Sequence, residues 1–159
     1  MEQQEQRLLL FELDGTPDPS VVYALDLSYV WQVMVAEQTS PVPLSPPLVR
    51  GIVHYRGRVV TVVDIAELIG KMTTATRPSG SFVLLKRESM VAYLGLAVAK
   101  IREIVFSVDL LKSDLEAGEG VRWVGKLQDK IVKVLDVPSI LAQIEAHFVP
   151  ERRLALGAS

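Results

Sequence analysis

The residues that could do chemistry in this chain are few, and its histidines and aspartates stand out. His54 and His147 could act as general bases or metal ligands, and Asp64 and Asp136 could act as a carboxylate pair. The two histidines lack metal-ligand spacing to each other, and a lone histidine in a turn is more often a hydrogen-bonding surface residue. The absence of cysteine excludes thiolate nucleophiles, disulfides and cysteine-based metal sites. We therefore expect no metal and no cofactor.

Asp64 and Asp136 each follow an aliphatic strand and precede a helical turn. A carboxylate at that position can accept hydrogen bonds from the unpaired N–H groups that begin a helix. This capping role explains both aspartates better than general acid–base catalysis, because each has its own helix start to satisfy. The chain also lacks a glycine-rich phosphate loop and a Gly-x-Ser-x-Gly nucleophile elbow. The sequence therefore favours a protein that is not an enzyme.

Composition and charge predict a folded domain without affinity for polyanions. Of the 159 residues, 49% are hydrophobic and 23% are charged, and the formal net charge is -2. Such a chain can bury a core, but it lacks the basic surface that nucleic acid or anionic lipid requires. The N-terminus is acidic, and no uncharged apolar stretch approaches the roughly 20 residues that cross a bilayer. We expect a cytoplasmic protein with no signal peptide, no membrane insertion and no nucleic-acid partner.

Short β-branched runs predict a mostly β chain with few helices. The expected strands are 8–13, 21–25, 59–63, 81–86, 91–99 and 131–135. Helical patterns are restricted to residues 27–33, the turn at 65–69 and a longer segment at 138–148. The proline-rich segment 39–47 cannot be a helix or a central strand. A connection inside the fold explains this segment better than a polyproline II ligand for an SH3 or WW domain.

An internal repeat links the two halves of the chain. The run from Gly57 to Ile69 matches the run from Asp129 to Leu141, position for position. Each copy has a turn residue, a basic residue, an aliphatic strand, an aspartate and then a spaced aliphatic pair. A weaker echo earlier in each half aligns Leu25, Leu27, Val30 and Val33 with Leu96, Val98, Ile101 and Ile104. Because chance similarity of strands does not explain the shared aspartate, we favour two copies of a β unit of roughly 70 residues.

A predicted hairpin spans Gly51 to Val60 and carries Tyr55, Arg56 and Arg58 near a tight turn. Arginine and tyrosine are enriched among residues that anchor protein interfaces. From composition alone, these arginines are as readily ordinary solvated turn residues. Trp31, Met34 and Trp123 are equally ambiguous, since large apolar side chains usually belong to a core.

The hairpin also carries a resemblance to a known family. The run from Val49 to Ile65, VRGIVHYRGRVVTVVDI, resembles the CheW family, the coupling adaptors of bacterial chemosensory arrays. The residues that match the family pattern are Gly51, Arg56, Gly57, Val62 and Asp64. This sequence departs from the pattern at His54, where the family usually has Asn, at Tyr55, usually Leu, and at Thr61, often Pro. The resemblance extends in family order over roughly residues 7 to 148.

The resemblance implies a mostly β fold of two SH3-like, five-stranded β-barrel subdomains packed side by side, with short helices and a C-terminal helix. Within one CheW-like domain over 1–159, subdomain one would cover about 15–80 and subdomain two about 81–148. The N-terminal strand 7–14 would complete the second barrel, and 149–159 would form a tail.

The same resemblance implies a scaffold that couples the helical tip of a chemoreceptor to the regulatory domain of a CheA-type histidine kinase. It further implies association in rings and a cytoplasmic location at membrane-associated arrays. Arg56, positioned by Gly51 and Gly57, is the leading expected partner contact, together with His54, Tyr55 and Arg58. The expected groove residues are Val30, Val33, Val35, Ile101 and Ile104. The alternative is a generic SH3-like module that binds an unrelated peptide or ligand.

Overall fold

Most of the regular secondary structure in the described residues is β-strand. The computed structural model describes residues 7–13, 16, 18–69, 80–86, 93–106, 110–112 and 120–148. The expected tail at 149–159 lies outside these residues. Within them the strands are β1 (Arg7–Glu12), β2 (Val21–Asp26), β3 (Val30–Val35), β4 (Val49–Tyr55), β5 (Arg58–Asp64), β6 (Ser81–Leu85), β7 (Tyr93–Val98), β8 (Lys100–Phe106), β9 (Leu110–Lys112), β10 (Val121–Leu127) and β11 (Lys130–Leu135). The helices are η1 (Leu27–Tyr29), α1 (Ile65–Leu68) and α2 (Val137–Phe148).

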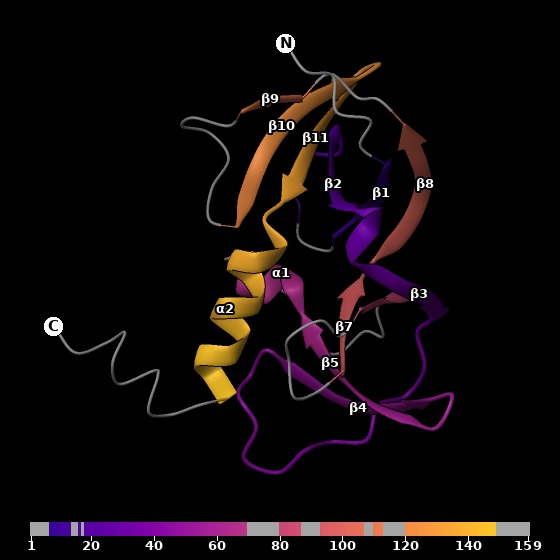
Figure 1. Cartoon of the computed structure of the whole chain (residues 1–159), viewed down its shortest axis with the longest axis vertical. Coiled ribbons are helices and arrows are strands. Elements are labelled where there is room, and N and C mark those ends of the chain that lie inside the picture. Colours follow the sequence, from indigo (N-terminus) through magenta and orange to yellow (C-terminus); the bar gives the residue numbers. More distant parts are fainter. Residues whose placement is uncertain are drawn as a thin grey trace, which may run out of the picture.

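These strands form two sheets, which lie one above the other in Figure 1 with α2 along one side. The upper sheet has the order β8-β1-β2-β11-β10-β9, and the lower sheet has the order β3-β6-β7-β5-β4. The predicted mostly β architecture of two units with a C-terminal helix is confirmed. The upper sheet carries one strand more than the five expected, because β9 pairs with the outer side of β10.

The two sheets repeat one pattern of pairing. The parallel register joins Val60 of β5 to Tyr93 of β7, and in the other sheet it joins Val132 of β11 to Val22 of β2. Val60 corresponds to Val132, and Val22 to Tyr93, when the two copies seen in the sequence are aligned. The register shifts also recur, at Arg50 and Arg122 beside the two hairpins. The predicted duplication is therefore visible in the backbone.

Sheet membership does not follow the expected boundary near residue 80. The chain crosses from the upper to the lower sheet between β2 and β3, through η1, and returns between β7 and β8. Each copy thus contributes strands to both sheets, and β6 and β7 lie in the sheet that holds β3, β4 and β5. The N-terminal strand β1 pairs with β2 and β8 in the upper sheet.

The predicted helix at 27–33 is wrong. Only Leu27–Tyr29 forms a single 3-10 turn, where the Asp26 side chain accepts a hydrogen bond from the Ser28 N–H. From Val30 onward the chain is strand β3, which pairs with β6. The apolar spacing fits a helix, but valine-rich sequence fits a pleated surface at least as well, and pairing with β6 decided between them.

Three apolar clusters hold the molecule together. One contains Leu8, Leu10 and Val132 and belongs to the upper sheet alone, and a second contains Val53, Val60 and Phe82 and belongs to the lower sheet alone. The largest draws buried residues from both sheets and from the helices α1 and α2, including Phe11, Tyr23, Val63, Leu96, Ile140 and Ile144. Strand β1 therefore buries both of its faces, since alternate residues enter different clusters.

Candidate functional site: the β4–β5 hairpin and the outer strands

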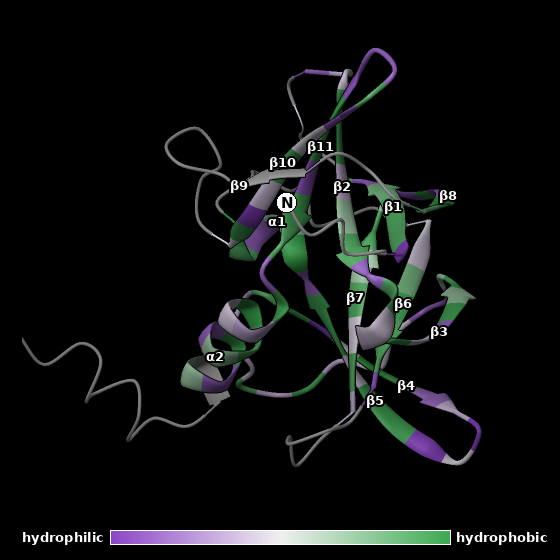
Figure 2. Cartoon of the chain, turned by 45° about the horizontal axis from the view of Figure 1, so that its top comes forward, coloured by the Kyte–Doolittle hydropathy of each residue, from purple (hydrophilic) through white to green (hydrophobic). Residues whose placement is uncertain are grey.

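The hairpin of β4 and β5 projects from the lower sheet, and its end is hydrophilic (Figure 2). Its two-residue turn places Arg56 at φ 48° and Gly57 at φ 75°. Positive φ at both central positions is the pattern of a type I′ turn, whose twist matches the flanking strands. Tyr55 and Arg58 face each other directly before and after this turn. The turn geometry therefore holds two arginines on either side of one glycine.

A segment of the proline-rich loop covers the outer edge of β4. Ser40 and Ile52 exchange two backbone hydrogen bonds of 2.9 and 2.8 Å, and the Thr39 hydroxyl donates to the Arg50 carbonyl over 2.8 Å. Gly51 lies beneath this contact at φ 138°, and a Cβ there would be 2.5 Å from the Ser40 carbonyl oxygen. Only glycine fits both the conformation and the space. The loop is thus a connection inside the fold, as expected, and it rigidifies the hairpin.

The base of the hairpin is held by an ion pair. The Arg50 guanidinium donates to Asp64 Oδ2 over 2.9 Å, and the two side chains are only 15% and 5% exposed. The other carboxylate oxygen of Asp64 accepts from the N–H groups of Ala66 and Glu67 at 3.0 and 3.4 Å. This is the geometry of a helix N-cap. With both oxygens engaged, Asp64 joins β4, β5 and α1 at one point.

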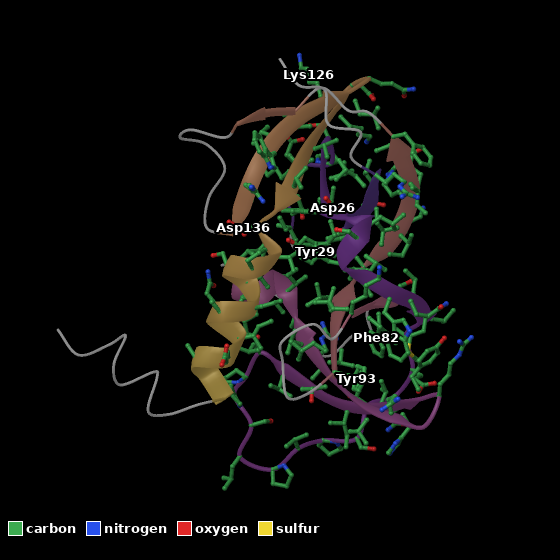
Figure 3. All side chains as sticks on the ribbon, viewed as in Figure 1. Asp26, Tyr29, Phe82, Tyr93, Lys126 and Asp136 are labelled. Atoms are coloured by element: carbon green, nitrogen blue, oxygen red, sulfur yellow. The ribbon has the colours of Figure 1, made fainter. Side chains whose placement is uncertain are left out.

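Three aromatic rings form a contiguous row beneath the turn. The Trp31 ring lies 5.3 Å from Tyr55, edge to face, and 5.5 Å from Tyr93, measured between centroids. Arg56 Cζ lies 5.3 Å from the Tyr55 ring centroid, and Arg58 Cζ lies 5.3 Å from that of Tyr93. Both are cation–π distances. Figure 3 places Tyr93 in the lower sheet, next to the strands of this hairpin. The row thus links two arginines through the side chains of three strands.

His54 does not join this row. It is exposed on β4 opposite Val59, and strand alternation puts it on the other face of the sheet from Tyr55.

Among the described residues, no group of three His, Cys, Asp or Glu side chains is placed to hold a metal ion. No helix in that part of the chain is long and apolar enough to cross a membrane.

The outer strands β3 and β8 carry the other expected site residues. Val30 and Val33 are half-buried and pack against the largest cluster, as does Ile101, whereas Val35 and Ile104 are 80% and 48% exposed. Phe106 on β8 is 67% exposed, and it is not among the site residues that the sequence predicts. The repeat could have found it, because the alignment that matches Val33 with Ile104 also matches Val35 with Phe106. Each copy therefore ends one outer strand in an exposed apolar residue.

The fold and these surfaces define the class of the protein, an internally duplicated two-sheet β domain with an arginine-bearing hairpin and apolar outer strands. A family model described as the CheW-like domain matches residues 7–145. The chain therefore belongs to the CheW-like family.

Two relatives show how far the similarity extends. The chemotaxis protein CheW of Thermotoga maritima is 24% identical over 141 residues, which cover 88% of this chain and 90% of that protein. Among solved structures, the scaffolding protein TtCheW from Thermoanaerobacter tengcongensis superposes with a TM-score of 0.70 at 17% identity. That match covers 84% of this chain and 90% of the other. At such identity the structural likeness supports the fold.

Proposed function

We propose that this protein is a non-catalytic scaffold that couples the cytoplasmic helical tip of chemoreceptors to the regulatory domain of a CheA-type histidine kinase. The observation that carries this proposal is the CheW-like match over nearly the whole described chain. The protein would act in the cytoplasm, at membrane-associated receptor arrays. In this role it binds two partners at once and needs no reactive group.

Two exposed surfaces support the proposal. The outer strands present Val35, Ile104 and Phe106, which offer apolar contacts to an amphipathic helix. The hairpin presents Arg56, a residue type that frequently anchors interfaces. We assign the receptor tip to the outer strands and a polar contact of the array to the hairpin.

The test is reconstitution with the receptor cytoplasmic fragment and the CheA-type kinase from the same cells. We expect the wild-type chain to bind each and to make kinase autophosphorylation depend on the receptor. Analytical ultracentrifugation of the mixture would show whether rings assemble. If the chain binds neither partner, the generic SH3-like module replaces this proposal.

Arg56→Glu sharpens the test at one residue. The variant should change the free energy of unfolding by less than about 0.5 kcal/mol, because Arg56 is an exposed turn residue. It should nevertheless weaken array binding about tenfold or more, since it reverses a charge at an expected contact. Lys126→Glu is the matched control, a charge reversal at an exposed position on β10, outside both proposed surfaces. Unchanged affinity of Arg56→Glu for both partners would remove Arg56 from the site.

A further inference from the structure

Among the residues that the structure describes, no carboxylate pairs with either arginine of the β4–β5 turn. The guanidinium carbon of each lies over a tyrosine ring, that of Arg56 over Tyr55 and that of Arg58 over Tyr93. A guanidinium over an aromatic ring uses its charge there rather than its hydrogen-bond donors, so its N–H groups remain able to donate to another acceptor. These N–H groups can bind a carboxylate through two parallel hydrogen bonds.

The aromatic row makes this arrangement rigid. Tyr55, Trp31 and Tyr93 pack against the cluster of the lower sheet, whose members Val60 and Val62 are fully buried. The rings therefore cannot shift without disturbing the interior of that sheet. A partner that binds arginines already positioned in this way avoids part of the entropy cost of immobilising long side chains.

The equivalent turn of the second copy lacks these features. Gln128 and Lys130 stand where the first copy has Arg56 and Arg58, and Leu127 replaces Tyr55. Lys130 donates to the Pro19 carbonyl over 3.2 Å, so its ammonium is already engaged. The second turn forms without an arginine over a tyrosine ring. The fold therefore does not require the arginine–tyrosine arrangement of the first turn.

The surroundings of the arginines indicate a protein partner rather than a polyanion. The turn offers two guanidinium groups over tyrosine rings, on a chain whose net charge is -2. Nucleic acid and anionic membranes are bound by broad basic surfaces, because affinity grows with each neutralised phosphate. Two arginines beside aromatic rings instead match two carboxylates beside apolar side chains.

We propose that Arg56 and Arg58 form a carboxylate-binding surface for an acidic, partly apolar protein segment, with Tyr55, Trp31 and Tyr93 as positioning residues. The proposal deepens the scaffold function and rests on it for the identity of the partner. The carboxylate chemistry itself stands on the geometry of the turn, so the two can be tested separately.

The test is an NMR titration of the full chain that follows the arginine Nε–H and Trp31 indole signals. The probe is a short helical peptide with two glutamates one turn apart and leucines beside them, and its control has glutamine at both positions. We expect the glutamate peptide to shift the signals of Arg56 and Arg58 and to bind about tenfold more tightly than its control. The affinity should fall severalfold between about 50 and about 300 mM NaCl.

Variants then separate the positioning role from the charges. Arg56→Gln combined with Arg58→Gln should abolish the preference for glutamate. Tyr55→Leu, which copies the second turn, should weaken binding about threefold, the size of one cation–π contact, and Tyr55→Phe should restore it. Equal loss in Tyr55→Leu and Tyr55→Phe would overturn the positioning role of the ring.

The remaining outcomes are decisive as well. Equal affinity for the glutamate and glutamine peptides, or tighter binding of inorganic polyphosphate than of the glutamate peptide, would overturn the carboxylate proposal. If receptor and kinase fail to bind while the glutamate peptide binds as expected, the scaffold function fails and the carboxylate surface stands. If receptor and kinase bind but the peptide preference is absent, the scaffold function stands alone.

Discussion

The two copies of the repeat follow the same backbone path but present different surfaces. In both, a register shift at an arginine, Arg50 or Arg122, precedes the hairpin. In both, the N–H of the aspartate between the second strand and the following helix donates over 2.7 Å, Asp64 to the Leu48 carbonyl and Asp136 to that of Gly120. The features that recur are those that set the path of the chain.

The copies differ first at the base of the hairpin. Asp64 is buried, paired with Arg50, and caps α1 with two hydrogen bonds. Asp136, at the start of α2 in Figure 3, accepts one hydrogen bond of 3.3 Å from the Ser139 N–H. Arg122 corresponds to Arg50, and its Cζ lies 5.6 Å from the ring centroid of Trp123. The equivalent arginine and aspartate therefore make different contacts in the two copies.

They differ again at the tip. The first turn carries arginines on tyrosines, whereas Lys130 of the second turn is tied to the segment before β2. The backbone follows the same path in both copies. The copies diverge in side chains that this path does not constrain. The divergence at the tip favours the first hairpin as the binding surface.

The largest expected effect tests the close approach that is special to the first copy. Gly51→Ala should destabilise the fold by about 3 kcal/mol, because it combines a strained φ with a clash against the Ser40 carbonyl. Trp123 occupies the equivalent position without a positive φ. Gly57→Ala is the control, since it has a positive φ but open space, and should cost about 1 kcal/mol. Urea unfolding measures both, and equal losses would refute the steric argument.

The next effect compares the two aspartates. Asp64→Ala should cost about 2 kcal/mol, because it removes both the cap of α1 and the ion pair with the largely buried Arg50 guanidinium. Asp136→Ala should cost about 1 kcal/mol through its weaker cap. A double-mutant cycle with Arg50→Ala checks the source of the difference, because the losses at Arg50 and Asp64 should not add. Additive losses at this pair would mean that the copies differ for another reason.

The smallest effect concerns Asp18, in the segment that holds the second hairpin. Hydrogen bonds from the Ser20 hydroxyl and N–H, at 2.6 and 2.9 Å, lower the pKa of Asp18 below its usual value of 3.8. A lowered pKa in the folded state adds stability above the unfolded pKa, and this is lost as the pH falls through the folded value. Ser20→Ala should raise the pKa of Asp18 toward 3.8, which an NMR titration of its carboxyl carbon measures. An unchanged pKa would assign the shift to other groups.

Local pattern was sufficient for part of the fold and part of the site. Strands such as 59–63 and 131–135, the helix that follows Pro138 and the hairpin at Arg56 all appear where the sequence places them. Pattern failed at 27–33, because the period of a few valines fits both a helix and a strand that pairs with a distant partner. It also missed β8 and its exposed Phe106, since polar residues interrupt the apolar run at 100–106.

What the sequence determined by itself was the repeat, because the two copies can be aligned directly. It also determined the two aspartates at strand ends and the glycines of the first hairpin, because each depends on chemistry within a few residues. The tertiary structure alone decided that each copy contributes strands to both sheets, since the parallel pairs β5–β7 and β11–β2 join residues far apart in the chain. It also decided which side chains meet. Trp31, Tyr55 and Tyr93 lie on three strands, and no spacing in the chain records that their rings form one row beneath two arginines.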